Sequence, residues 1–170
     1  MSTRTRLGIA AVVALVSAAG VGIVVAGWVG GHGNPRLPIG LHATPGVAPF
    51  AGYREVRVAI GRRCARVVVA ETDAQRSQGL RGASALGPYA GMLFAMGGDS
   101  NVAFTMSGVA SPLDITWYSA GGGRVDKTHM RPCPRVQHCP VYRSRERYRY
   151  ALEVPTRSPD APARLAPCSS

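Results

Sequence analysis

The sequence is poor in acidic residues, in lysine and in aromatic side chains, and it contains no internal repeat. Of its 170 residues, nine are acidic and 20 are basic, Lys127 is the single lysine, and 6% are aromatic. Hydrophobic residues make up 46% and the mean hydropathy is +0.04, values that exclude a wholly disordered chain and a polytopic membrane protein. A chain of this length holds one modest domain.

Catalytic signatures are also missing. No serine lies in a nucleophile elbow or a triad pattern, and the histidine and cysteine spacing matches no standard zinc module. The sequence therefore favours a non-enzymatic protein, and no cofactor is expected.

One long uncharged segment, Leu7 to Val29, begins near the amino terminus. As a helix it would extend about 34 Å, enough to cross a hydrocarbon core of about 30 Å. It is longer than the apolar core of most signal peptides, which favours an uncleaved signal anchor, although cleavage before Gly27 is the alternative. Arg4 and Arg6 precede the segment, so residues 1–6 are expected in the cytoplasm and the rest of the chain outside it.

The predicted location is therefore the cell membrane, with a single pass and an extracytoplasmic carboxyl-terminal domain. The alternative is a secreted protein released by signal cleavage. Residues 30–52 are rich in glycine and proline, which disfavour regular structure, and are interpreted as a linker whose part from Pro45 to Phe50 could pack on the domain edge. Residues 53–155 form the predicted domain, and residues 156–170 a loosely ordered, proline-rich tail.

Alternation of apolar and polar residues predicts a mainly β fold within the domain. Val56, Val58 and Ile60 alternate, and the run 66–70 follows a short glycine-containing loop, which predicts a hairpin. Thr72 or Asp73 can cap a short helix that ends at Gly79. Further strands are expected at 92–96, 102–106, 113–118, 124–129 and 148–154. Together these elements predict a small β-barrel-like or curled sheet with one short helix (α+β), preceded by the transmembrane helix.

Several short motifs resemble one known family in their order and spacing. They are Gln78-Gly79-Leu80-Arg81-Gly82, the run 91–96, Phe104-Thr105-Met106, Pro112-Leu113-Asp114-Ile115, Pro132-Cys133, Cys139-Pro140-Val141-Tyr142 and Leu152-Glu153-Val154. Over residues 56–155 the chain resembles the domain of unknown function 192 family. The resemblance implies a small β-rich domain, frequently exported in bacteria, without an established biochemical role. The chain departs from the family pattern at Thr105, Ser107, Gly108 and Val109, and again after Val154.

Four cysteines lie in a region predicted to be exported and therefore oxidising. Cys133 and Cys139, with prolines beside them, are interpreted as a disulfide. Metal binding by these cysteines with His129 and His138, or free thiols, are the alternatives. Cys64 and Cys168 form a possible second disulfide, and two unrelated thiols are equally compatible with the sequence.

A candidate pocket comprises Phe104, Met106, Pro112 and Asp114. Asp114 stands at the start of an apolar strand and must be solvated, hydrogen-bonded or paired there. A structural role is favoured over one as acid, base or ligand contact, and its potential catalytic partners are Asp126, Glu153 and His129. Methionines 92, 96 and 106 are expected in the core rather than in a copper site.

Arginines 143, 145, 147 and 149 alternate, and would form a basic face on an extended strand. Such a face could bind anionic lipid head groups or a cell-wall polymer, or it could be a solvated surface of an arginine-rich protein. Nucleic acid is excluded by the predicted compartment. The leading hypothesis is a membrane-anchored, extracytoplasmic binding module or envelope-associated protein with lipid, polymer or envelope-protein partners. The alternative is a hydrolase or transferase that uses Asp114.

Overall fold

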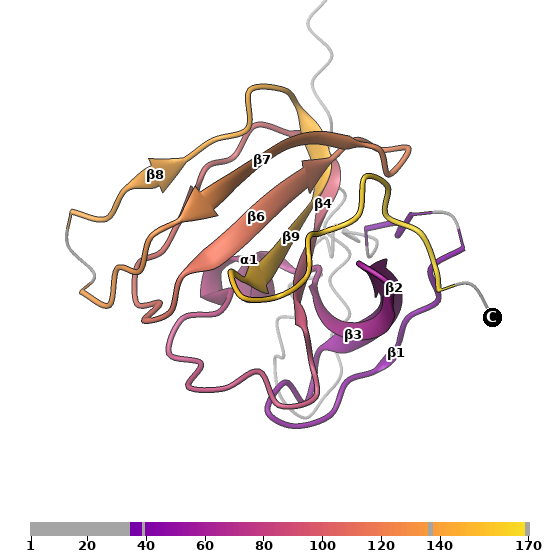
Figure 1. Ribbon diagram of the computed structural model, residues 1–170, viewed down its shortest axis with the longest axis horizontal. Coiled ribbons are helices and arrows are strands. Elements are labelled where there is room, and N and C mark those ends of the chain that lie inside the picture. The colour runs from indigo at the N-terminus through magenta and orange to yellow at the C-terminus, as the bar shows by residue number, and fades with distance from the viewer. Residues whose placement is uncertain (1–34, 39, 136–137, 169–170) are drawn as a thin grey trace, which may run out of the picture. The chain divides into compact units, whose positions relative to one another are not determined.

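Seven strands form one mixed sheet in the computed structural model, which describes residues 35–38, 40–135 and 138–168. In spatial order they are β1 (Thr44–Pro45), β2 (Arg54–Ile60), β3 (Arg63–Ala70), β4 (Gly91–Ser100), β9 (Tyr148–Pro155), β6 (Leu113–Tyr118) and β7 (Arg124–Met130) (Figure 1). Strands β5 (Phe104–Thr105) and β8 (Val141–Tyr142) pair separately, and α1 (Asp73–Gln78) is the helix of this part of the chain. The predicted mainly β fold with one short helix is confirmed.

The hairpin and the helix form where local sequence predicts them. Strands β2 and β3 pair antiparallel, with Val58 opposite Ala65. Thr72 caps α1 by accepting a hydrogen bond from the Gln75 amide, and the Gln75 side chain reaches back to the cap. Gly79 ends the helix at a φ of +51°, in the region that favours glycine. This helix lies in the connection between the parallel neighbours β3 and β4.

The sheet does not close into a barrel, so the barrel-like alternative is wrong. Strands β1 and β7 form its two edges in the described chain. The reason lies in the connections: β4 runs parallel to β3, and β9 enters between β4 and β6 from the end of the domain. These pairings use both sides of every central strand and leave the first and last strands apart. Figure 1 shows β2 and β3 bending strongly at one end.

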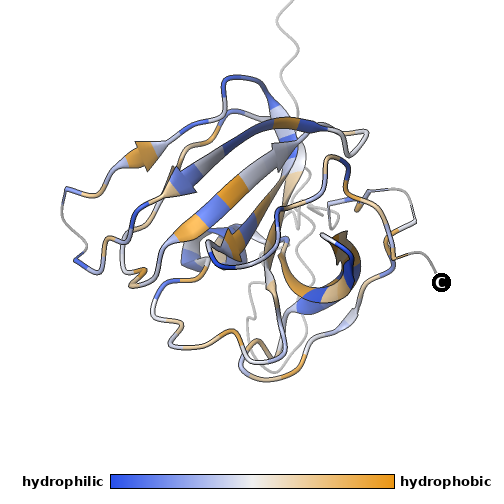
Figure 2. Ribbon diagram, viewed as in Figure 1, coloured by the Kyte–Doolittle hydropathy of each residue, from blue (hydrophilic) through white to orange (hydrophobic). Residues whose placement is uncertain are grey.

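Both faces of the central strands are buried, and each face has its own apolar core. Along β9 the faces alternate: Ala151 belongs to one cluster, while Tyr150, Leu152 and Val154 belong to the other. In Figure 2 the first half of β6 shows apolar, polar and apolar residues in turn, and its second half shows residues of intermediate hydropathy. Because both of their faces are buried, the middle strands consist of nearly continuous runs of apolar residues. We call the face that includes Ala151, Phe94 and Trp117 the Phe94 face, and the opposite one the Tyr150 face.

Two segments predicted outside the domain pack against the Tyr150 face. In the predicted linker, Leu41 is buried and the Tyr150 hydroxyl donates to the carbonyl of Arg36 at 2.7 Å. In the predicted tail, Leu165 is buried and the Tyr118 hydroxyl donates to the carbonyl of Pro162 at 3.0 Å. The structure thus differs from a simple tether and a loosely ordered tail, because scattered apolar residues in both segments find buried positions on the sheet.

Two disulfides are present in the described chain. Cys133 is joined to Cys139, and Cys64 on β3 is joined to Cys168 near the carboxyl terminus. The second bridge links residues 104 positions apart and fastens the carboxyl-terminal segment to the β2–β3 hairpin. The predicted membrane segment at 7–29 lies outside the described residues. Among those that are described, no helix is both long and apolar enough to cross a bilayer.

Candidate functional site

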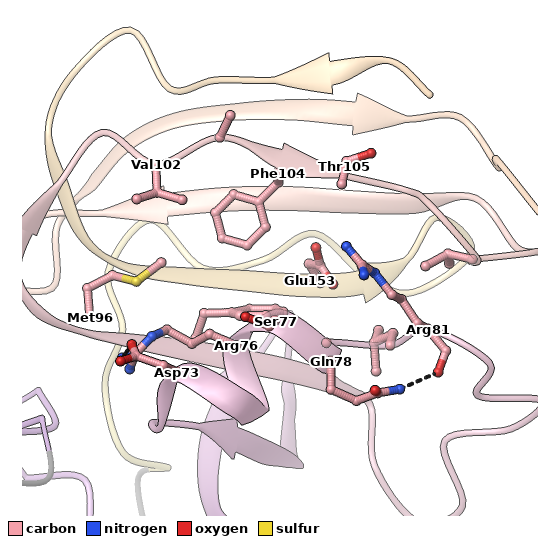
Figure 3. A pocket seen from close by; sticks show the side chains of 15 residues that line it. Asp73, Arg76, Ser77, Gln78, Arg81, Met96, Val102, Phe104, Thr105 and Glu153 are labelled. Atoms are coloured by element: carbon pink, nitrogen blue, oxygen red, sulfur yellow. Dashed lines mark hydrogen bonds and ion pairs between the residues drawn. The ribbon is translucent and has the colours of Figure 1, made fainter. Parts of the chain in front are cut away.

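A cavity of about 420 Å³ opens on the Phe94 face between α1, the turn after it, β4 and the segment around β5. Its lining residues are Asp73, Arg76, Ser77, Gln78, Gly79, Leu80, Arg81, Phe94, Met96, Val102, Ala103, Phe104, Thr105, Val109 and Glu153 (Figure 3). We call it the Glu153 pocket. Its volume falls in the range of sites that bind small organic molecules, about 300–1,000 Å³.

The apolar part of the pocket is built on β4 and β5. Phe94 and Phe104 contact each other edge to face, with ring centroids 5.0 Å apart, and Phe104 also packs on Trp117 and Tyr148. Met96 lies two residues beyond Phe94 and adds a flexible thioether to the same surface. Gly79 lies against the Phe94 ring, since a Cβ at that position would be in ordinary van der Waals contact with it, at 3.5 Å. A rigid aromatic floor therefore lies beneath the end of α1.

Glu153 supplies a carboxylate on the inner wall. It lies on the central strand β9, directly opposite Met92 of β4 and Ile115 of β6, both fully buried. Glu153 itself is 5% exposed, and no hydrogen bond or ion pair to its side chain is found within the described residues. Burial raises its pKa to about 8 because the charged form is poorly solvated. At neutral pH this carboxyl is therefore largely protonated and faces the cavity without a protein partner.

The two charged residues at the α1 rim neutralise each other. Arg76 donates to the Asp73 carboxylate at 2.5 Å, and also to the carbonyls of Glu71 and Ala95 at 2.6 and 2.7 Å. These contacts fix the guanidinium at the end of the helix. Asp73 and Arg76 therefore line the cavity with polar groups but add little net charge to it.

Arg81 stands opposite Glu153. Its carbonyl accepts a hydrogen bond from the Gln78 side chain at 2.9 Å, which holds the turn after α1 in place. The aliphatic part of Arg81 packs beside Gly108. A Cβ added to Gly108 would lie 3.6 Å from the Cβ of Arg81. Figure 3 shows its guanidinium pointing toward Glu153, yet the two groups form no ion pair in the structure. The described chain offers the Arg81 side chain no carboxylate partner.

The structure does not bring the four residues of the predicted pocket together. Phe104 lines the Glu153 pocket, whereas Met106 is fully buried in the core and Pro112 is exposed. Asp114 lies at a smaller hollow of about 240 Å³, beside His129, Thr156 and Asp160. Residues close in sequence separate here because Phe104 lies on β5, which pairs with β8 outside the seven-stranded sheet, whereas Asp114 lies on β6 within that sheet.

Of the potential partners of Asp114, only His129 meets it. The two are cross-strand neighbours in β6 and β7, with Asp114 Oδ1 2.9 Å from His129 Nδ1. The Thr156 hydroxyl also approaches Nδ1, at 3.3 Å. A hydroxyl relay requires the carboxylate and the hydroxyl on opposite ring nitrogens. This exposed group therefore resembles a cross-strand polar contact more than a nucleophile with its base, which supports the structural interpretation of Asp114.

The predicted basic face is not a single extended strand, because β9 begins only at Tyr148. Arg145 pairs with Asp126 at 2.8 Å, and Arg149 pairs with Asp99 at 2.9 Å. Arg147 donates to the carbonyl of Asp99, and Arg143 is exposed. Three of the four arginines thus bind groups of the protein itself.

The alternative metal ligands are also placed by the structure. Cys133 and Cys139 share a disulfide and so cannot act as thiolates, and no group of three or more potential ligand side chains gathers in the described part of the chain. Met92 and Met106 are fully buried in the Phe94-face core, as expected for packing residues, while Met96 reaches the pocket.

Comparison with known proteins agrees with this architecture. The profile of DUF192, described as an uncharacterized ACR, matches residues 56–161. The chain belongs to the DUF192 family. Among curated proteins, none matches it significantly.

Two crystal structures share the DUF192 fold seen here. A protein of unknown function from Novosphingobium aromaticivorans DSM 12444 is 22% identical, with a TM-score of 0.58 over 73% of this chain and 93% of that one. A candidate transcription regulator from Sinorhizobium meliloti 1021 is 26% identical, with a TM-score of 0.51 over 66% of this chain and 91% of that one.

The central residue of this DUF192 domain's pocket was not singled out by sequence reasoning as a pocket residue. The sequence suggested Glu153 only as a potential catalytic partner of Asp114 and as part of the Leu152-Glu153-Val154 motif. A usable signal was present, since it is the one acidic residue in a strand otherwise rich in apolar and aromatic residues. Arg76 and Arg81 gave no such signal, because arginines are abundant throughout the chain.

Proposed function

We propose that this DUF192 domain is a non-enzymatic binding module that takes up a small organic molecule in the Glu153 pocket. The observation that carries the proposal is the carboxyl group of Glu153, a residue that is 5% exposed, which has no partner in the described chain and opens on a cavity of about 420 Å³. Because no protein group among the described residues bonds to this carboxyl, a ligand in the cavity can form hydrogen bonds with it without displacing an existing contact. The aromatic floor beside it offers apolar contact area to the same ligand.

We further propose that the domain works outside the cytoplasm, carried by the predicted membrane segment at 7–29. Two disulfides support this location, since such bonds persist mainly in oxidising compartments. A reporter fused after residue 170 tests it. We expect signal from a reporter that is active only outside the cytoplasm, and a cytoplasmic signal together with reduced thiols would contradict this location.

Binding can be tested with 3-methylbutan-1-ol, a neutral probe with a branched apolar body and one hydroxyl. The full-length chain, labelled with ¹³C at the methionine methyl groups, is placed in lipid nanodiscs and titrated by NMR. We expect the Met96 signal to shift, while the buried Met92, Met106 and Met130, which do not line the pocket, report that the fold is unchanged.

A matched pair of variants locates the site. Ser77 is exposed and lines the pocket, so Ser77→Trp should fill the cavity and abolish the Met96 shift. Ala74 is exposed on the same helix but does not line the pocket, so Ala74→Trp should leave the shift intact. Loss of the response in both variants, or in neither, would contradict binding in this pocket.

A further inference from the structure

The Glu153 pocket presents a buried carboxyl group and a guanidinium group that face each other without pairing. Glu153 lies on the inner wall, Arg81 stands at the mouth, and no ion pair joins them in the structure. We infer, on the basis of the binding role proposed above, that the ligand is a free α-amino acid with an apolar side chain. Its ammonium group would bind Glu153, its carboxylate would bind Arg81, and its side chain would contact Phe94, Phe104 and Met96.

The ammonium group suits Glu153 because a nearby cation favours the ionised carboxylate. Burial alone holds this carboxyl in its neutral form, with a pKa of about 8. An opposite charge in contact lowers a carboxyl pKa and makes a charge-assisted hydrogen bond. Binding at pH 7 therefore transfers the Glu153 proton to the buffer: the carboxylic acid loses H⁺, and the resulting carboxylate pairs with the ammonium group, which keeps its own protons.

The carboxylate of the ligand suits Arg81. A guanidinium presents two parallel N–H groups that match the two oxygens of a carboxylate. Arg81 is exposed and has no carboxylate partner among the described residues, so this geometry is available without breaking an existing ion pair. An amine without a carboxylate would leave Arg81 unpaired near a second cation.

The remaining charges in the pocket do not change this assignment. Asp73 and Arg76, on α1, pair with each other, and β4 and β5 contribute apolar or neutral side chains to the lining. Glu153 and Arg81 are therefore the two ionisable groups that a ligand meets without a partner in the described chain. The space of about 420 Å³ admits an amino acid of leucine size beside the aromatic floor.

The experiment compares three probes with the same branched body, using the full-length chain in lipid nanodiscs. L-leucine carries both charged groups, 3-methylbutan-1-amine lacks the carboxylate, and 4-methylpentanoate lacks the amine. We expect calorimetry to show leucine binding about tenfold or more tightly than either analogue, because each analogue loses one charge-assisted contact. Equal binding of leucine and either analogue would overturn the inference.

Two variants separate the contacts. Glu153→Gln should weaken leucine about tenfold or more and leave 4-methylpentanoate nearly unchanged, whereas Arg81→Gln should weaken leucine similarly and leave the amine nearly unchanged. Glu146→Gln and Arg57→Gln remove the same charges at exposed positions away from the pocket and should change nothing. Unaltered leucine affinity in either pocket variant would contradict the assignment, provided that the methyl signals of Met92 and Met106 show a native fold.

Proton release gives a second readout that simple pocket damage would not produce. Leucine binding at pH 7, measured in two buffers of different ionisation enthalpy, should release close to one proton from the original protein and none from Glu153→Gln. Absence of release from the original protein would refute the ammonium contact at Glu153. If 3-methylbutan-1-ol still shifts Met96 while leucine shows no preference, the amino acid assignment fails and the binding module stands; if neither binds, both fail.

Discussion

Two of the buried glutamates, Glu55 and Glu153, lie in different regions of the domain and have opposite surroundings. At the β2–β3 hairpin, Glu55 is 7% exposed and accepts two hydrogen bonds from Arg66, at 2.9 and 2.5 Å, and one from the Tyr89 hydroxyl at 2.8 Å. The Arg66 contact is the main cause of its lowered pKa. In the pocket, Glu153 is 5% exposed and has none of these partners within the described chain, so burial raises its pKa.

The difference separates a carboxylate that stabilises the fold from one that the fold leaves available. Arg66 also lies 5.2 Å above the Tyr89 ring, so the Glu55 cluster is closed by contacts among its own members. Buried charges are ordinarily paired in this manner, since an isolated one is costly. The unpaired carboxyl opens on a cavity, and that coincidence is what makes Glu153 a candidate ligand contact.

The largest expected effect is a pH dependence of stability that originates at Glu153. Its pKa is about 8 in the folded protein against an ordinary 4.5, so the folded state keeps a proton that the unfolded state loses. Stability should therefore fall as pH rises from 4.5 to 8, by about 3–5 kcal/mol from this group. Urea unfolding of the original protein and Glu153→Gln across this range isolates the effect, with Glu146→Gln as control. Parallel profiles would show that Glu153 is not buried unpaired.

At neutral pH, removing the paired carboxylate of Glu55 should destabilise the protein, unlike removing the unpaired carboxyl of Glu153. Glu55→Gln leaves the Arg66 guanidinium without its carboxylate, and we expect the free energy of unfolding to drop by about 3 kcal/mol. Glu153→Gln, in contrast, should not be destabilising at pH 7.5. If urea unfolding shows similar losses of unfolding free energy in the two variants, the two glutamates do not differ in the way described.

A smaller loss is expected from one hydroxyl of the Glu55 cluster. Tyr89→Phe keeps the ring against Phe50 but removes the donor to Glu55 and the acceptor for the Val47 amide, which should cost about 1–1.5 kcal/mol. Tyr53→Phe is the matched control, because Tyr53 packs on the same phenylalanine and no hydrogen bond of its hydroxyl is found in the described structure. Equal thermal stability of both variants would argue against a closed hydrogen-bonded cluster.

The smallest effect concerns another buried carboxylate, Asp126. It accepts hydrogen bonds from the backbone amides of Lys127 and Arg145 as well as from the Arg145 side chain, which is 85% exposed. Arg145→Gln should therefore cost at most about 1 kcal/mol, and Arg143→Gln close to nothing. A larger loss for the Arg143 variant in urea unfolding would mean that the arginines act as one structural unit.

The same carboxylate gives a pH dependence of the reverse sign. The Arg145 side chain is the main cause that lowers the pKa of Asp126 to about 2 from an ordinary 3.8. Its contribution to stability is present above pH 3.8 and should be lost as pH falls through 2, whereas the Glu153 effect appears between 4.5 and 8. Two separated windows in one stability profile would distinguish the paired and the unpaired carboxylates.

Local sequence predicted most of the sheet because each long strand carries its own periodic signal. Alternation located β2, the apolar run after a glycine-containing loop located β3, and Thr72 with Gly79 located α1 almost to the residue. Strands β1 and β8 escaped prediction, since two residues cannot show a period. The arginine alternation was misinterpreted as strand structure because solvent-exposed side chains impose no backbone conformation of their own.

The site was less predictable than the fold. Phe104 was predicted to line a pocket and does so. The sequence predicted Asp114 as the acidic residue of that pocket, whereas in the structure this residue is Glu153. A pattern reveals that an acid lies in an apolar strand, yet it cannot reveal whether an arginine arrives from elsewhere to pair with it. Glu55 obtains Arg66 through the β2–β3 pairing, and Glu153 obtains no partner from either neighbouring strand.

By itself the sequence determined the composition of a small β-rich domain, its hairpin, its helix and its family motifs, because these depend on residues near one another along the chain. Only the tertiary structure decided that the sheet stays open, that β9 lies between β4 and β6, and that Glu55 is paired while Glu153 faces a cavity. The physical reason is that pairing and burial are set by long-range contacts, and the strand that carries Glu153 meets Met92 and Ile115 only after residues from three distant segments have come together.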